Sequence, residues 1–420
     1  LVAKNKPTGS NSPFASLSGG KTPAQIYKNG ISAELSDLRQ YDVGTYDKSS
    51  DTLFVSDLKL SGLYENAYPN AAAPSTVTVM GAKLTVLPSA QADLAAFKVG
   101  DKVTLLLTTT GQVAGAVSPD VAKSNAVGVA EVKGTMATIK LLDGILTLEG
   151  KTTYSEAAAA KLNGCLVTVS SYKRDYLTLS KVNGKGASTA LNLTTNRMGT
   201  KELSAGARFF EQVSNGRLVE IDRSDITITS IPANKITYVG YDWAGRVDKL
   251  VLNDVTGDRY DYGIIRYQPA GYQETSGNPD GNGEYKNGEI SVTNGSGKHT
   301  YVVGSVDGAK TNRMGGVAGS LDQLDGQNRM AAFMPLNEAK GIRRAQFDTD
   351  AMLLTTNSMV IPISDKVECY NKTTGDWFKP GEDGDHKAAL NLALAFSDDI
   401  TVYYDRSPEE GGKVRIVVVE

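Results

Sequence analysis

Cysteine and histidine, two residue types that often carry chemistry, are nearly missing from this chain. Its 420 residues include two cysteines, Cys165 and Cys369, and two histidines, His299 and His386. We expect both cysteines to be free thiols, with Cys369 in the core of a strand and Cys165 at a half-exposed strand position. So little cysteine fits the surface of a Gram-positive cell, where disulfides are sparse, and fits a cytosolic protein equally well.

The histidines give little support to catalysis. Both lie in polar stretches rich in Gly or Asp, which predict loops, and neither has a neighbour at metal-ligand spacing. The chain also lacks the Gly-x-Ser-x-Gly motif that would support a histidine-based triad. We therefore expect a protein that is not an enzyme, although a triad built from distant residues stays open as an alternative.

Excess charge and long apolar runs are absent as well. The chain has 44 basic and 47 acidic residues, a net charge of −3, which gives no electrostatic reason to bind nucleic acid. No apolar run approaches the ~20 residues that span a bilayer, and no basic amphipathic stretch suggests a membrane surface. The chain opens at Leu1 without methionine or a signal peptide, so we expect a fragment whose targeting segment lay upstream.

Aromatic residues are also few, at 7%, with two tryptophans. Paired carboxylates of a glycoside hydrolase would not be visible in one sequence, but such enzymes need a wide, aromatic-lined cleft. Trp243 and Trp377 both fall in predicted turns. Each could stack on a sugar ring, which makes them candidate ligand-binding residues, or could cover the end of a small barrel.

Residues that favour turns and strands are plentiful, including 43 glycines and many Thr, Ser, Asn and Val residues. The length exceeds one core and predicts roughly two to four domains. An apolar fraction of 40% is lean, as expected when small domains expose much of their surface. The composition predicts a mainly β protein with few short helices.

One module is repeated within the sequence. Residues 190–198 (ALNLTTNRM) and 351–359 (AMLLTTNSM) are identical at six of nine positions. Both copies end with a turn and an apolar strand, at 245–252 and 412–418. A similar ending at 41–55 reads as a β-hairpin and predicts a third, truncated copy.

A second module type lies between these copies. Each copy has a hairpin, an alanine-rich helical turn and a Gly-x-x-Val-Thr strand, at 100–104 and 164–168. About five strands in 60 residues suit a small closed or nearly closed barrel, because closure removes exposed edges. A looser third copy is expected at 262–347, with a glycine-rich loop inserted at 271–288.

The sequence therefore predicts tandem small β-barrel or β-sandwich modules of two alternating types, an arrangement typical of elongated proteins with many contacts rather than a single catalytic cleft. The expected order is a partial hairpin module, two small barrels, a β module, a divergent barrel with the insertion, and a second copy of the β module: 1–57, 58–119, 120–186, 187–257, 258–347 and 348–420.

Acidic residues raise the question of calcium. Asp254, Asp258 and Asp261 form one candidate group of ligands, and residues 382–385 (EDGD) form another. Neither matches the EF-hand spacing or the calcium-binding nonapeptide of β-solenoids. The alternative is that these residues occupy hairpin corners, where Asp and Gly are common.

Four further stretches of the sequence are distinctive. They are 24–30 (AQIYKNG) followed by 34–43 (ELSDLRQYDV), then 62–70 (GLYENAYPN), 252–260 (LNDVTGDRY) and 369–378 (CYNKTTGDWF). These stretches resemble the non-anchoring β-rich region of S-layer-homology-domain surface proteins from gut Clostridia and relatives. The resemblance implies export and an extracellular location at the cell wall or S-layer. In that family, separate S-layer-homology domains bind wall polysaccharide. Their helical motif is not found here, so no wall-binding residue is carried over.

We therefore expect a non-catalytic cell-surface or S-layer-associated structural or display protein, with cell-wall polysaccharide as a partner through anchoring domains outside this chain. Self-association into a lattice is a further expectation. The alternative is an adhesin module that binds glycans or host matrix, with the two tryptophans and the insertion at 271–288 as its site.

Overall fold

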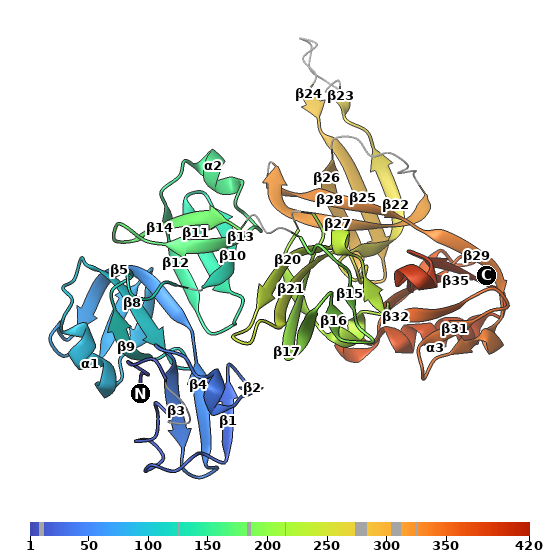
Figure 1. Ribbon diagram of the computed structural model, residues 1–420. Helices are drawn as coiled ribbons and strands as arrows, with labels where there is room; N and C mark the ends of the chain where they lie inside the picture. The colour runs from blue at the N-terminus through green and yellow to red at the C-terminus, as the bar shows by residue number, and fades with distance from the viewer. Residues whose placement is uncertain are drawn as a thin grey trace. The chain divides into compact units, whose positions relative to one another are not determined.

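The computed structural model describes residues 1–7, 12–124, 126–182, 186–214, 216–273, 284–303, 312–324 and 326–420 (Figure 1). Strands make up 49% of it and helices 11%, which confirms the predicted mainly β class. The chain forms two compact units. The first consists of 1–184, 203–207 and 240–249, and the second of 185–202, 208–239 and 250–420.

The first unit begins with a four-stranded sheet in the order β2-β1-β4-β3. The hairpin predicted at 41–55 is present as β3 and β4, which pair antiparallel from Val43–Ser56 to Asp47–Thr52. Phe14, Leu38 and Leu53 are buried beneath the sheet. Its elements are β1 (Gln25–Lys28), β2 (Ile31–Ser32), the 3-10 helix η1 (Leu35–Asp37), β3 (Val43–Asp47) and β4 (Thr52–Ser56).

A five-stranded half-barrel follows, in the order β7-β6-β5-β8-β9. A single parallel bridge between Val86 and Val113 joins its two ends. The predicted alanine-rich helical turn is α1, which lies between the third and fourth strands. The elements are β5 (Lys59–Tyr68), β6 (Thr76–Val79), β7 (Ala82–Thr85), α1 (Pro88–Leu94), β8 (Lys102–Leu107) and β9 (Val113–Val117).

The next five strands close fully, in the order β10-β11-β12-β14-β13. Here the third and fifth strands pair in parallel at two positions, from Lys151–Tyr176 to Thr152–Leu177. Helix α2 again lies between the third and fourth strands, and Ser155 caps it by accepting the Ala158 N–H. The elements are β10 (Val127–Lys133), β11 (Met136–Leu141), β12 (Thr147–Thr152), α2 (Glu156–Ala160), β13 (Leu166–Ser170) and β14 (Tyr176–Lys181).

These two five-stranded parts of the first unit share one core. Leu60, Leu105, Ile139 and Leu148 are fully buried in it. The backbone N–H of Leu63 also donates to Ser171 Oγ at 2.7 Å, across 108 residues of sequence. The half-barrel and the closed barrel of this unit are therefore packed against each other and are not connected by a flexible linker alone.

The second unit contains a third five-stranded barrel, closed in the order β22-β25-β26-β28-β27. The strand order, with parallel pairing of the third and fifth strands, repeats that of the first two barrels. This connectivity is that of a five-stranded Greek-key barrel of the OB type. The strands are β22 (Asp261–Gln268), β25 (Gly288–Asn294), β26 (Gly297–Val303), β27 (Arg313–Leu324) and β28 (Gln327–Pro335).

The glycine-rich loop predicted at 271–288 contains secondary structure. Strands β23 (Gly271–Gln273) and β24 (Glu284–Lys286) pair antiparallel and form an arm beyond β22 and β25 (Figure 1). The strand β25 also begins inside the predicted loop. Residues 274–283 lie outside the described residues.

The repeated β module forms two sheets that share the order of five strands and differ in the position of their sixth, edge strand. The first has the order β19-β15-β16-β17-β21-β20, with β18 paired to β17. A long strand of 12 residues, β17, is central to it. The elements are β15 (Leu191–Asn192), β16 (Arg197–Met198), β17 (Lys201–Gln212), β18 (Val219–Ile221), η2 (Arg223–Asp225), β19 (Ser230–Ile231), η3 (Ala233–Lys235), β20 (Ile236–Tyr241) and β21 (Val247–Asn253).

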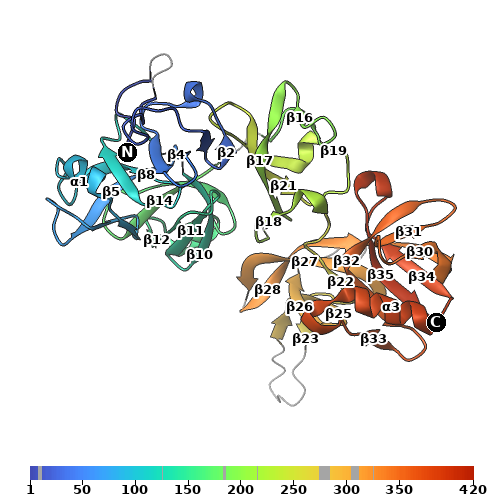
Figure 2. The same ribbon diagram turned by 90° about the horizontal axis from the view of Figure 1, so that it is seen from below.

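The last sheet has the order β29-β34-β35-β32-β31-β30, with β33 paired to β32, again a strand of 12 residues. It differs from its sister by α3, a helix that the sequence analysis missed. Helix α3 packs against β32 and β35 (Figure 2). Its residues Leu390 and Leu394 are buried in the core of this module. The elements are β29 (Asn337–Ile342), η4 (Arg344–Gln346), β30 (Phe347–Asp348), β31 (Leu353–Thr355), β32 (Val360–Asn371), β33 (Asp376–Phe378), η5 (Glu382–Gly384), α3 (His386–Phe396), β34 (Ile400–Tyr404), η6 (Pro408–Glu410) and β35 (Val414–Val419).

In the described part of the chain, none of the helices has the length and apolar character needed to cross a membrane. Cys165 and Cys369 are both free thiols, as predicted. Cys369 is fully buried in β32, whereas Cys165 directly precedes β13 and is partly exposed.

Candidate binding pocket in the second unit

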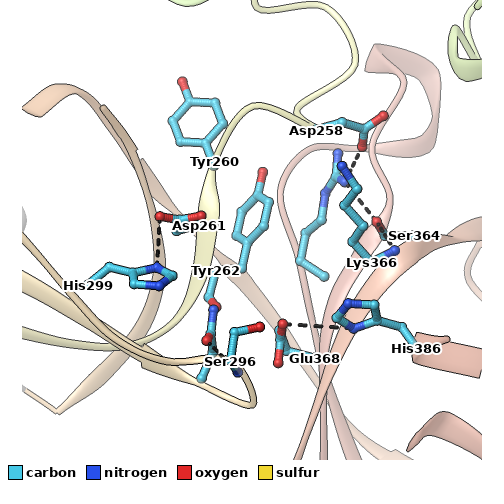
Figure 3. Close-up of a pocket in the computed structure, with 12 residues that line it drawn as sticks. Asp258, Tyr260, Asp261, Tyr262, Ser296, His299, Ser364, Lys366, Glu368 and His386 are labelled. Carbon is cyan, nitrogen blue, oxygen red and sulfur yellow. Dashed lines mark hydrogen bonds and ion pairs between the residues drawn. The ribbon is translucent and has the colours of Figure 1, made fainter. Parts of the chain in front are cut away.

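A pocket of about 150 Å³ lies within the second unit, between the third barrel and the last sheet (Figure 3). Its side chains come from β22, β26 and the turn between β25 and β26 on one side. On the other side they come from β32, β35 and the start of α3. The twelve lining residues are mostly polar or charged, so the site is suited to a hydrophilic ligand.

Both histidines of the chain line this pocket, and the prediction that they lie in loops is wrong. His299 is inside strand β26, and His386 is the first residue of α3. The Asp385 carboxylate caps α3 by accepting hydrogen bonds from the backbone N–H groups of Lys387 and Ala388. This cap places His386 in the first turn of the helix.

Each histidine stands beside a carboxylate. The Nδ1 atom of His299 lies 3.2 Å from Oδ2 of Asp261. Tyr301, two residues further along β26, points to the same side and donates its hydroxyl proton to the same oxygen. Burial raises the pKa of Tyr301, and the bond to Asp261 raises it further, so its hydroxyl remains a donor.

The second pair is formed by His386 and Glu368. The Nδ1 atom of His386 lies 3.8 Å from Oε1 of Glu368 and 3.0 Å from the carbonyl oxygen of Val367. The other oxygen of Glu368 accepts the backbone N–H of Gly295 at 2.9 Å, which links the last sheet to the β25–β26 turn of the barrel. Glu368 is 6% exposed, and this burial raises the pKa of its carboxyl.

A buried arginine, Arg415, also lines the pocket. Arg415, which is 1% exposed, donates from Nη1 to Asp258 at 2.5 Å and from Nη2 to Asp405 at 2.8 Å. Lys413 adds a second cation 2.8 Å from Asp258. Burial by itself would raise the pKa of Asp258, but the charges of Arg415 and Lys413 hold it below its usual value.

No protein-family model, curated protein or solved structure matches this chain. The charged side chains of the pocket are arranged as pairs: Asp258 with Arg415, Asp261 with His299, and Glu368 with His386. Such pairs hold the side chains in place. Both oxygens of Asp258 are occupied by Arg415 and Lys413, so the polar atoms left to contact a ligand belong to the other two pairs.

The structure brings two of the three predicted calcium ligands to the pocket, Asp258 and Asp261, and separates the third. Asp254 instead receives a bond of 2.5 Å from Arg406. Within the described ranges, no three His, Cys, Asp or Glu side chains are grouped so that they could hold a metal ion. Calcium at these positions stays a prediction from the sequence.

The two tryptophans lie outside the pocket, and each is in a different unit. Trp243 is half-buried and donates its indole N–H to the carbonyl oxygen of Lys28 at 3.3 Å. The prediction that Trp377 lies in a turn is wrong, because it is inside strand β33. It is half-buried, with its ring centroid 4.9 Å from that of Tyr370. Both rings are thus engaged in contacts within the protein, and sugar binding by them stays a prediction.

Sequence reasoning missed the residues that make this pocket, namely His299, His386, Glu368, Lys366 and Arg415. One signal was available for Arg415, because a charged residue within the apolar run of β35 (VRIVVV) requires a buried partner. The histidines and Glu368 carried no comparable local signal.

Proposed function

We propose that this protein is a non-catalytic structural or display protein of the cell envelope, in which tandem β modules act as a stiff spacer. The observation that carries the proposal is the buried network around Arg415. It ties segment 256–258, directly before the third barrel, to strand β35 at the end of the chain. A spacer that bears load needs joints of this kind between its modules.

The network is extensive for one joint. Besides its two carboxylate partners, Arg415 donates to the carbonyl oxygen of Thr256 at 2.5 Å and to Ser364 Oγ at 3.1 Å. Removing one partner from such a buried pair costs about 3–5 kcal/mol, because an uncompensated charge is left behind. The joint is therefore costly to open, which favours a mechanical role.

The first unit supports the same interpretation. The ammonium of Lys28 lies 2.6 Å from Asp42, and both side chains are 1% exposed. The half-barrel and the second barrel share a single core, as described above. Repeated modules with packed joints are typical of proteins that span distance and offer many contacts rather than one catalytic cleft.

The proposed location is the extracellular face of the cell wall or S-layer, as the sequence resemblance implies. Attachment to wall polysaccharide would then use anchoring domains outside this chain. Fractionation of the producing cells tests this: we expect the protein in the wall fraction, and its confinement to the cytosol would overturn the proposed location. Turnover of a wall polysaccharide or peptide by the purified chain would overturn the non-catalytic role.

Mechanical stiffness is tested separately by pulling single molecules from both ends. We expect the second unit to resist unfolding as a whole, and Arg415→Met to lower its unfolding force. An unchanged force in that variant would count against the network as the element that stiffens the joint.

A second candidate function, glycan binding, is favoured by the polar pocket of the second unit. Five-stranded Greek-key barrels of the OB type bind oligosaccharides or oligonucleotides in other proteins, although a shared fold does not establish a shared ligand. The near-neutral charge of the chain, −3, favours a sugar over a nucleic acid.

A further inference from the structure

We propose that the pocket between the third barrel and the last sheet binds a single six-membered sugar ring that carries a carboxylate, as a hexuronic acid does. This inference rests on the second candidate function, glycan binding, and names its ligand class. The size, the polarity and the charge of the pocket each support one part of this proposal.

The size of the pocket limits the ligand to one ring. Its volume is about 150 Å³. A cavity of roughly that volume accommodates a benzene-sized molecule, and the same space would hold about five waters in the liquid. A monosaccharide is larger than benzene, so one ring would fill the pocket and extend from its open side, and a longer sugar chain could place only one ring there.

The polarity of the walls matches a ring covered in hydroxyl groups. Strand β32 lines the pocket with three alternate residues, Ser364, Lys366 and Glu368, while the intervening Val367 faces the core. The opposite wall supplies Asp261 and His299 (Figure 3). Carboxylates and imidazoles accept or donate the hydrogen bonds that sugar hydroxyls offer.

The charges of the side chains that line the pocket favour a carboxylate on that ring. Three lining acids already face cationic or donor groups: Asp258 faces Arg415, Asp261 faces His299, and Glu368 accepts the Gly295 N–H. One of the twelve residues that line the pocket is a lysine, Lys366. Among the described residues, its ammonium has no ion-pair partner. Its charge is thus left for the ligand.

The number of acids in the wall also limits the charge of the ligand. Asp261 and Glu368 would repel a doubly charged phosphate ester more strongly than a singly charged carboxylate. The lone pairs that remain on the Asp261 and Glu368 oxygens can meanwhile accept hydrogen bonds from ring hydroxyls. A sugar acid with one negative charge meets both conditions.

The test uses the whole 420-residue chain and two probes, D-glucuronic acid and D-glucose, measured by calorimetry and by ligand-observed NMR. We expect the chain to bind glucuronic acid about tenfold more tightly than glucose. Lys366→Met should remove that preference by weakening glucuronic acid binding more than it weakens glucose binding. The matched control is Lys340→Met, an exposed lysine of the same sheet that lies outside the pocket.

Each outcome decides a separate point. If neither sugar binds, both the glycan-binding candidate and the inference are overturned. If both sugars bind equally, or Lys366→Met keeps the preference, glycan binding stands and the carboxylate inference is overturned. If Lys340→Met reduces glucuronic acid binding as much as Lys366→Met does, the preference is general electrostatic attraction and the inference is overturned. Folding of each variant is checked by its melting temperature.

Discussion

Arg415 and Asp258 form a partly buried ion pair of 2.5 Å although 157 residues separate them in sequence. Asp258 lies directly before the third barrel, and Arg415 lies on β35 of the last sheet. The same guanidinium holds Asp405, which is fully buried at its side chain. Arg415 therefore links the segment before the third barrel to the last sheet.

Replacing Arg415 by Ala is expected to destabilise the second unit by about 3–5 kcal/mol, because the fully buried Asp405 would be left without its cation. Urea unfolding measures the loss. The chain has one tryptophan in each unit, so Trp377 fluorescence in a Trp243→Phe background reports the second unit alone.

The control for this prediction is Arg343→Ala. Arg343 is 60% exposed at its side chain and lies 3.9 Å from Asp398, so its loss should cost at most about 1 kcal/mol. Equal effects of the two substitutions would contradict the assignment of the buried network as the stabilising joint.

Substitution of Glu368 by Gln should change how stability depends on pH. Burial raises the pKa of Glu368 in the folded protein above the usual value of 4.5, so the folded state binds its proton more tightly than the unfolded state does. The free energy of unfolding therefore falls as the pH rises from the unfolded pKa through the folded one. Gln stays neutral and can still accept the Gly295 N–H.

Thermal unfolding from acidic to neutral pH measures this effect. We expect Glu368→Gln to match the parent chain at acidic pH and to be more stable than it above the folded pKa. Glu382→Gln, a change at an exposed carboxylate of the same module, is the control. A variant that is less stable than the parent at neutral pH would show that the charged form of Glu368 stabilises the fold.

The two cysteines are expected to differ in reactivity. Cys369 is fully buried, and this burial raises the pKa of its thiol, so both access and thiolate formation are suppressed. Cys165 is partly exposed beside β13. Maleimide labelling of the native protein, read by mass spectrometry, should modify Cys165 alone, and labelling of Cys369 should require denaturant. Equal native labelling of both would contradict the packing of β32.

Gly257 should tolerate no side chain. Its φ of +71° favours glycine, and a Cβ atom there would collide with the Asp405 carboxylate and the Arg415 guanidinium. We expect Gly257→Ala to cost about 2–4 kcal/mol in urea unfolding. Gly384→Ala is the matched control, since its φ is +77° but nothing lies within 4 Å of the added carbon. Its cost should be only the backbone strain, about 1 kcal/mol.

Local sequence patterns determined the β character of this protein and much of its repeated organisation. The related stretches 190–198 and 351–359 lie at the start of two separate sheets. Each of these sheets contains its own strand of 12 residues, β17 in the first and β32 in the second. The two Gly-x-x-Val-Thr stretches became β8 and β13, and the hairpin expected near the N-terminus is present. Strands are marked by alternating apolar and polar side chains, and turns by particular residue types. Both patterns extend over only a few positions, so a single sequence is enough to reveal them.

Only the tertiary structure decided which distant residues meet. His299 and His386 share one pocket because β26 and α3 belong to parts of the chain that pack against each other, and neither neighbourhood contains a signal for the other. Helix α3 was missed because it is inserted in one copy of a module whose sister has no such helix. Closure of the barrels, pairing of Arg415 with Asp258, and the position of Lys366 all depend on contacts across long stretches of sequence. Packing and buried charge act between whole elements, so these features follow from the fold and not from local composition.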